Sequence, residues 1–135
     1  MIGQIDDILE EVKKMAKDNF SHISTNDYKL LFAIYGRDGV MGALEPKKDV
    51  SPHELGIIIE VVAKTQELAN TICSFARSSF LHFGYPGRIA TAGNLAFRYS
   101  QLDIQAGEVY EFSIYHLLTV EDPKEYFPIT IKQLG

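Results

Sequence analysis

The feature that most constrains the fold is a β-branched run followed at once by a long helical pattern. Residues 54–63 include three isoleucines and two valines, which is typical of a buried strand. Thr65 can then supply an N-cap oxygen, and apolar residues recur on one face until Phe83, where Gly84 and Pro86 end the helix. Both elements have an apolar surface to bury, so they are expected to form a helix layer packed on a sheet layer.

Four further segments carry a secondary-structure pattern. Ile5 to Phe20 places apolar residues three and four apart, with acids early and lysines late, and predicts a first helix. Tyr28 to Tyr35 is a short apolar run that predicts a strand. Leu95 to Tyr99 suits a short strand, and Val109 to Leu118 alternates apolar and polar residues as a strand does. The predicted order is helix, strand, strand, helix, strand, strand.

These elements predict one α+β domain spanning residues 1–135. With 135 residues and 46% hydrophobic residues, the chain can bury a core of its own. Two helices of this kind most simply pack on one face of a mainly antiparallel four-stranded sheet. The predicted architecture is therefore a two-layer sandwich of ferredoxin-like character.

Charge and cysteine content exclude several classes of partner. The net charge of −5 opposes binding to phosphate backbones, and the lysines of the first helix are interleaved with acids. Cys73 is the only cysteine, so an internal disulfide cannot form, which fits a cytoplasmic protein. The sequence has no apolar run of about 18 residues. We therefore expect a cytoplasmic protein without a nucleic-acid or membrane partner.

Two glycine-rich loops are the first candidates for a binding site. One begins at Tyr35 and continues through Gly42, and the other runs from Tyr85 to Phe97 and can present Arg88, Thr91 and Asn94. Backbone N–H groups in such turns can hold an anion. The spacing matches no nucleotide-binding fingerprint. The alternative is that the glycines only shape a hairpin-like excursion and a helix C-cap.

The second helix offers a seam of polar and reactive side chains. Gln66, Asn70, Cys73 and Arg77 fall within one narrow stripe at the edge of the apolar face. Arg77 could clamp a carboxylate or phosphate through its planar fork. The alternative pairs Arg77 with a strand glutamate such as Glu60 and treats Cys73 as a small buried hydrophobe.

The residues name no catalytic group, and no cofactor follows from them. The four histidines are scattered, and no pair has a metal-ligand spacing, so no metal site is predicted. A thiol nucleophile at Cys73 would need a neighbouring base, which no spacing identifies. A stand-alone enzyme using Cys73 or a histidine is therefore the lowest-ranked alternative.

Three motifs carry a resemblance to a known family. They are Tyr-Gly-Arg-Asp-Gly-Val-Met-Gly-Ala-Leu-Glu-Pro at 35–46, His-Glu-Leu-Gly-Ile-Ile-Ile-Glu-Val-Val-Ala-Lys-Thr-Gln-Glu-Leu-Ala-Asn at 53–70, and Tyr-Pro-Gly-Arg-Ile-Ala-Thr-Ala-Gly-Asn-Leu-Ala-Phe at 85–97. Together they resemble the C-terminal region of large proteins of the acyclic-terpene-utilisation AtuA family and its bacterial relatives. Arg98 stands where proline is expected in those relatives.

The resemblance implies a C-terminal domain, or a fragment, of a larger protein that acts in the catabolism of acyclic terpenoids or related branched carboxylic compounds. It transfers no catalytic residue and no cofactor. The leading hypothesis is an accessory or substrate-facing domain that completes a site with an upstream domain or subunit. The competing hypothesis is a domain that mediates homo-oligomerisation and has no site of its own. The ligand-binding candidates are Arg37, Asn70, Arg77, Arg88, Thr91 and Asn94.

Overall fold

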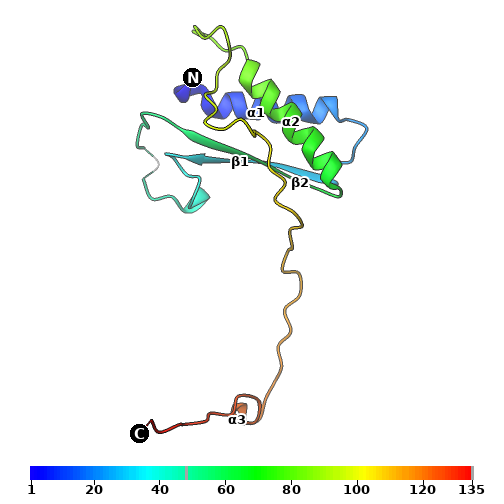
Figure 1. Cartoon of the computed structure of the whole chain (residues 1–135), viewed down its shortest axis with the longest axis vertical. Coiled ribbons are helices and arrows are strands. Elements are labelled where there is room, and N and C mark those ends of the chain that lie inside the picture. The colour runs from blue at the N-terminus through cyan, green and yellow to red at the C-terminus, as the bar shows by residue number, and fades with distance from the viewer. Residues whose placement is uncertain (48, 135) are drawn as a thin grey trace.

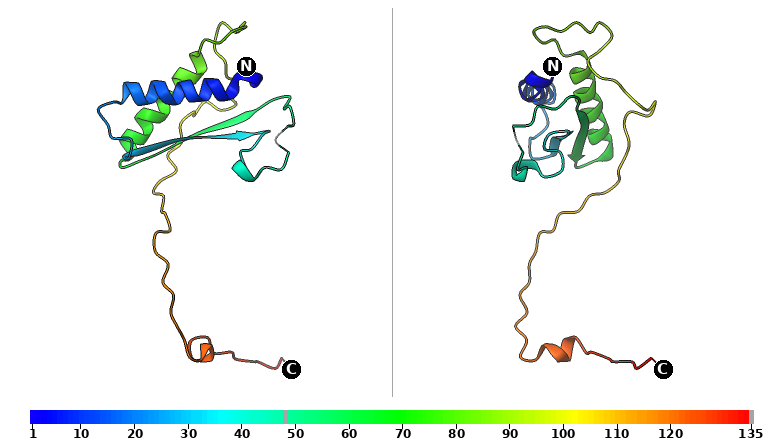
Figure 2. Two further views of the ribbon diagram at one scale, coloured as in Figure 1. Left: turned by 180° about the vertical axis from the view of Figure 1, so that it is seen from behind. Right: turned by 90° about the vertical axis from the view of Figure 1, so that its left-hand side faces the viewer.

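The computed structural model describes residues 1–47 and 49–134 (Figure 1). Its elements are η1 (Ile2–Gln4), α1 (Ile5–Asn19), β1 (Tyr28–Tyr35), η2 (Gly42–Leu44), β2 (Gly56–Ala63), α2 (Gln66–His82) and α3 (Pro123–Tyr126). Residues 1–47 and 49–99 form a body in which both long helices lie on one side of the two strands (Figures 1 and 2). Residues 100–134, here called the C-terminal arm, cross this body and then run away from it.

The sheet of the body consists of β1 and β2. The two strands are antiparallel, and their register runs from Tyr28 opposite Ala63 to Tyr35 opposite Gly56. Both strands and both long helices match the sequence predictions to within two residues at each end. Because these four elements are defined by local apolar patterns, they could be predicted without knowledge of their partners.

The ends of the two long helices follow from local chemistry. Asp6 and Asp7 lie in the first turn of α1 and Lys17 in its last turn, as the helix dipole favours. The side-chain oxygen of Thr65 accepts a hydrogen bond from the backbone N–H of Leu68 (3.2 Å) and caps α2. The predicted N-cap is therefore confirmed.

The core lies between the helices and the covered face of the sheet. The largest fully buried side chains are Val12 on α1 and Ile72 and Phe80 on α2. One cluster joins the first half of α1 to Ala76, Phe80 and Ile34 of β1. A second cluster joins the end of α1 to Ile72. The body thus has two apolar clusters along the helices, and partly buried Leu30 of β1 packs against both.

The predicted four-stranded, ferredoxin-like sheet is wrong. The described residues contain one sheet of two strands, and neither Leu95 to Tyr99 nor Val109 to Leu118 is a strand. The protein is still a small α+β structure. Alternation in residues 109–118 shows that the segment could sit in a sheet, but a strand forms only beside a partner edge. In the structure this segment has none.

Candidate functional site

The two glycine-rich loops both reach the beginning of α1. Arg37, in the first loop, donates from Nη1 to both carboxylate oxygens of Asp6 (2.7 and 2.8 Å). The side-chain amide of Gln4, one residue before α1, donates to the backbone oxygen of Pro86 in the second loop (3.4 Å). The start of α1 therefore brings together two loops that are about fifty residues apart in the sequence.

Arg37 is held in an ion-pair cluster. Besides Asp6, its Nε donates to Asp38 Oδ1 (3.2 Å). Burial lowers the pKa of Arg37, but the hydrogen bonds to the two carboxylates outweigh that effect and raise it above its ordinary value. The guanidinium is thus fully charged and already bound to two acids. It links the loop to α1 and is not positioned as an anion clamp.

The backbone of the first loop closes on the end of β1. The N–H groups of Arg37, Asp38 and Gly39 all donate to the backbone oxygen of Ile34 (3.2, 3.1 and 2.9 Å). A Cβ at Gly39 would lie 2.7 Å from the backbone carbon of Ile34, so only glycine fits this approach. These donors are used within the chain and do not form an anion cradle. An open hollow of about 390 Å³ lies against this turn, lined by Phe32, Ala33 and residues 38–42.

Asn94 ties the second loop to the end of α2. Its side-chain Nδ2 donates to the backbone oxygens of Phe80 (3.0 Å) and Phe83 (2.8 Å). Its backbone N–H donates to the oxygen of Leu81 (2.8 Å). The last carbonyls of a helix have no partner inside the helix, and Asn94 supplies three donors to them. Asn94 therefore acts first as a helix cap.

Arg88 and Thr91 occupy different positions in the same loop. Arg88 donates from Nη1 to the backbone oxygen of His82 (3.3 Å), which is another carbonyl at the end of α2. Thr91 is exposed. Two buried polar atoms, Arg88 Nε and Asn94 Oδ1, find no hydrogen-bond partner among the described residues. Both atoms are enclosed by the body and do not face solvent, so a bound molecule could reach the loop only through exposed groups such as the Thr91 side chain.

The seam on α2 connects the body to the arm. Arg77 forms a bidentate pair with Asp103, with Nε to Oδ1 at 2.8 Å and Nη2 to Oδ2 at 3.0 Å. Hydrogen bonding to Asp103 raises the pKa of Arg77 against the opposing effect of burial. The partner of Arg77 is therefore Asp103 of the arm and not Glu60. Asn70 accepts a hydrogen bond from Gln66 (2.8 Å) on the exposed side of the helix.

Cys73 lies half-buried between α2 and β2. Its Sγ donates to the backbone oxygen of Ile59 (3.8 Å). Burial raises the pKa of the Cys73 thiol, and the charge of Asp103 raises it further, while Arg77 opposes both. The thiol is consequently protonated at neutral pH. This environment is the opposite of the electropositive one that activates a nucleophilic cysteine.

Sequence reasoning missed Asp6 and Asp103, the two carboxylates that pair with the candidate arginines. They lie 31 and 26 residues from Arg37 and Arg77, and no local pattern marks either acid as a partner. Within residues 1–47 and 49–134, His, Cys, Asp and Glu side chains form no cluster of three or more that could hold a metal ion. The same part of the chain contains no helix with the length and apolar character needed to cross a membrane.

Comparison with known proteins gives no match: no family model, no curated protein and no solved structure is similar to this chain.

Proposed function

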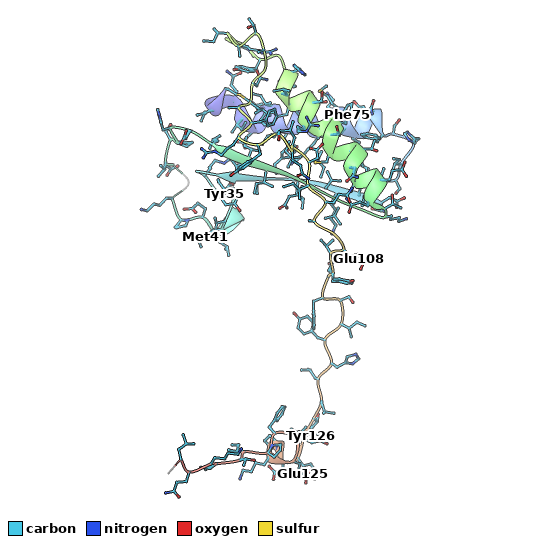
Figure 3. All side chains as sticks on the ribbon, in the orientation of Figure 1. Tyr35, Met41, Phe75, Glu108, Glu125 and Tyr126 are labelled. Atoms are coloured by element: carbon cyan, nitrogen blue, oxygen red, sulfur yellow. The ribbon has the colours of Figure 1, made fainter. Side chains whose placement is uncertain are left out.

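We propose that this chain is an assembly domain that binds another polypeptide by adding a strand from its C-terminal arm. The observation that carries the proposal is the exposure of apolar side chains along the arm. More than half of the exposed large hydrophobic side chains of the described residues lie at or after Leu102, with Tyr110 88% and Leu117 100% exposed. Figure 3 shows Glu108 near the point where the arm leaves the body, and Glu125 and Tyr126 well away from the body.

The accessible surface of the chain is larger than that expected of a compact monomer, which supports the binding of a partner. The accessible surface is 11286 Å². A compact monomer of 15.2 kDa is expected to expose about 7,100 Å². The difference, about 4,000 Å² on one chain, is several times the surface that each partner loses in a standard interface. Surface of this size and apolar character is typical of an interface.

The composition of the arm also separates it from an ordinary solvated tail. Disordered tails are poor in aromatic and β-branched residues, because such residues favour burial. Residues 109–118 instead contain Val109, Tyr110, Phe112, Ile114 and Tyr115, and Glu111 and Ser113 alternate with Tyr110, Phe112 and Ile114. Among the described residues, the backbone-to-backbone hydrogen bonds of the arm are confined to the turn at 122–127. An extended apolar segment with free backbone groups is suited to strand addition.

The ion pair between Arg77 and Asp103 anchors the beginning of the arm to α2. It is bidentate and partly shielded, with side-chain exposures of 21% and 35%. Residues beyond it are free to reach a partner while the body remains folded around its own core. An assembly domain needs both properties, a stable body and an accessible binding segment.

The test uses the full chain, diluted until it sediments as a monomer. We expect the backbone amides of residues 109–118 to exchange hydrogen rapidly, because the monomer supplies no partner strand. The double variant Phe112→Asp/Ile114→Asp should unfold within about 0.5 kcal/mol of the wild type. As a control, Ile72→Ala, which empties a fully buried position of α2, should lose about 2–5 kcal/mol.

Two results would contradict the assembly role. Protection of these amides in the monomer would make the arm a strand of its own body. A loss of stability in the double variant as large as that in Ile72→Ala would lead to the same conclusion.

A second candidate function is the substrate-facing role that the AtuA-like resemblance implies. It is supported by the motifs at 35–46, 53–70 and 85–97, the last of which carries Arg88 and the exposed Thr91. In this role the loop would hold a small polar group of a branched acyclic carboxylic compound. A thermal-shift titration with short acyclic terpenoid acids tests it, since a ligand that binds only the folded state raises the melting temperature. Equal shifts in wild type and Arg88→Ala would place any binding elsewhere.

A further inference from the structure

We propose that the partner of the arm is a second copy of this chain, and that each copy adds residues 109–118 to the β1 edge of the other. This inference rests on the assembly function proposed above and specifies its partner. The sheet described here has two strands, so β1 and β2 each keep one unpaired edge. An unpaired edge of eight residues is a template for a strand from another chain.

The uncovered face of the sheet is suited to an added strand. Leu31 of β1 and Ile58 of β2 lie on this face with 47% and 46% of their surface exposed. The register places Leu31 opposite Glu60 and Lys29 opposite Val62, so these four side chains share one face. The face is therefore apolar, with one positive charge on β1 and one negative charge on β2.

Charge distinguishes the two edges. Alternation along the arm places Glu111 on the face opposite to that of Phe112. An arm paired with β1, with Glu111 on the uncovered face, brings this carboxylate next to Lys29. Pairing with β2 would bring it next to Glu60, and like charges on neighbouring strands are unfavourable. The β1 edge is therefore the better docking site.

The structure already contains the contact that this pairing requires. Glu111 Oε2 lies 3.9 Å from Lys29 Nζ of the same chain. The arm leads away from the sheet in every view (Figures 1 and 2), and Phe112 and Ile114 keep 71% and 61% of their surface exposed. In a domain-swapped pair, the same contact forms between copies. Each arm then continues along the β1 strand of its partner.

The apolar face of the arm would extend the partner's core. With Glu111 on the uncovered face, Phe112 and Ile114 point to the helix-covered side. With the arm parallel to β1 and Glu111 beside Lys29, they adjoin Leu30 and Phe32 of β1, which already pack partly buried against the core. The reciprocal exchange would bury a large part of the excess surface of about 4,000 Å² on each chain, which is ample for a stable dimer.

Disulfide trapping between differently substituted copies tests the exchange. In a Cys73→Ser background, full-length Lys29→Cys is mixed with full-length Glu111→Cys and oxidised, so that a 29–111 disulfide can form only between chains. The matched control mixes Glu60→Cys with Glu111→Cys. Within a specific pair the 29 and 111 thiols meet at millimolar effective concentration, whereas position 60 lies one strand farther from the arm, beyond the reach of a disulfide. At micromolar protein the 29–111 mixture should therefore crosslink about 100-fold faster than the control. Sedimentation of the wild type should show a dimer that dissociates on dilution.

Three results would overturn the inference, and they separate it from the assembly function. Equal crosslinking in both mixtures excludes the β1 edge of a second copy. A monomer at all concentrations whose 109–118 amides exchange freely excludes self-exchange but leaves the arm available to a different polypeptide. A monomer whose 109–118 amides are protected shows that the arm pairs with its own sheet, and then both proposals fail.

Discussion

Replacing Asn94 by alanine should loosen the loop at 85–97 from the end of α2. The side chain donates to the backbone oxygens of Phe80 and Phe83 at 3.0 and 2.8 Å, and alanine removes both donors. A hydrogen bond of this kind contributes about 1 kcal/mol net, so the variant should lose about 2 kcal/mol. The amide oxygen of Asn94 has no partner within the described residues, so its removal breaks no further hydrogen bond there.

Thermal unfolding followed by circular dichroism at the helix band measures this loss. For a body of this size, 2 kcal/mol corresponds to a fall in melting temperature of about 8–16 °C. Thr91→Ala is the matched control, because Thr91 lies exposed on the same loop. It should stay within about 0.5 kcal/mol of the wild type. If Asn94→Ala melts together with Thr91→Ala, the capping role assigned to Asn94 is refuted.

Two further predictions concern the first loop and the thiol. Gly39→Ala should lose about 1–3 kcal/mol in chemical denaturation, because its Cβ would meet backbone atoms of Ile34 at 2.7 to 2.9 Å. Gly84→Ala, with nothing within 4 Å of its Cβ, should lose little, and equal losses would contradict the argument. Burial raises the pKa of the Cys73 thiol above that of an unfolded thiol, which is about 8.5. The contribution of this thiol to the free energy of unfolding is therefore complete below about pH 8.5 and is lost as the pH rises through the folded pKa. Denaturation midpoints from pH 7 upward should therefore fall more steeply in the wild type than in Cys73→Ala, and parallel curves would contradict this.

The body of the protein could be predicted from the sequence because its elements are locally defined. The spacing of apolar residues in α1 and α2, and the apolar runs of β1 and β2, require no knowledge of distant partners. The structure places these elements within two residues of their predicted ends. Their packing into a helix layer on a sheet follows from the apolar faces they must bury.

The sheet beyond β2 could not be predicted, because a strand depends on a neighbour that the local pattern does not name. The alternation at 109–118 is the same whether the segment pairs with its own sheet, with another chain or with nothing. The sequence prediction assumed the first of these. In the structure, the arm passes Arg77, where Asp103 anchors it, and then leaves the sheet.

The polar residues of the loops were predicted to bind a ligand, and the structure shows most of them in contacts within the chain. Arg88 and Asn94 lie in the loop that follows α2, six and twelve residues after its last residue, and the end of a helix leaves carbonyl groups that need donors. That requirement was readable from the sequence. The pairing of Arg37 with Asp6 was not, because it depends on how α1 packs on the body.

The central claim is that the arm is a binding segment that its own body leaves unpaired. Hydrogen exchange of the full chain, read at residues 109–118 in the monomer and in the concentrated protein, tests it most directly. The account predicts fast exchange of these amides in the monomer and strong protection once a second copy is bound. Strong protection in the monomer would contradict it.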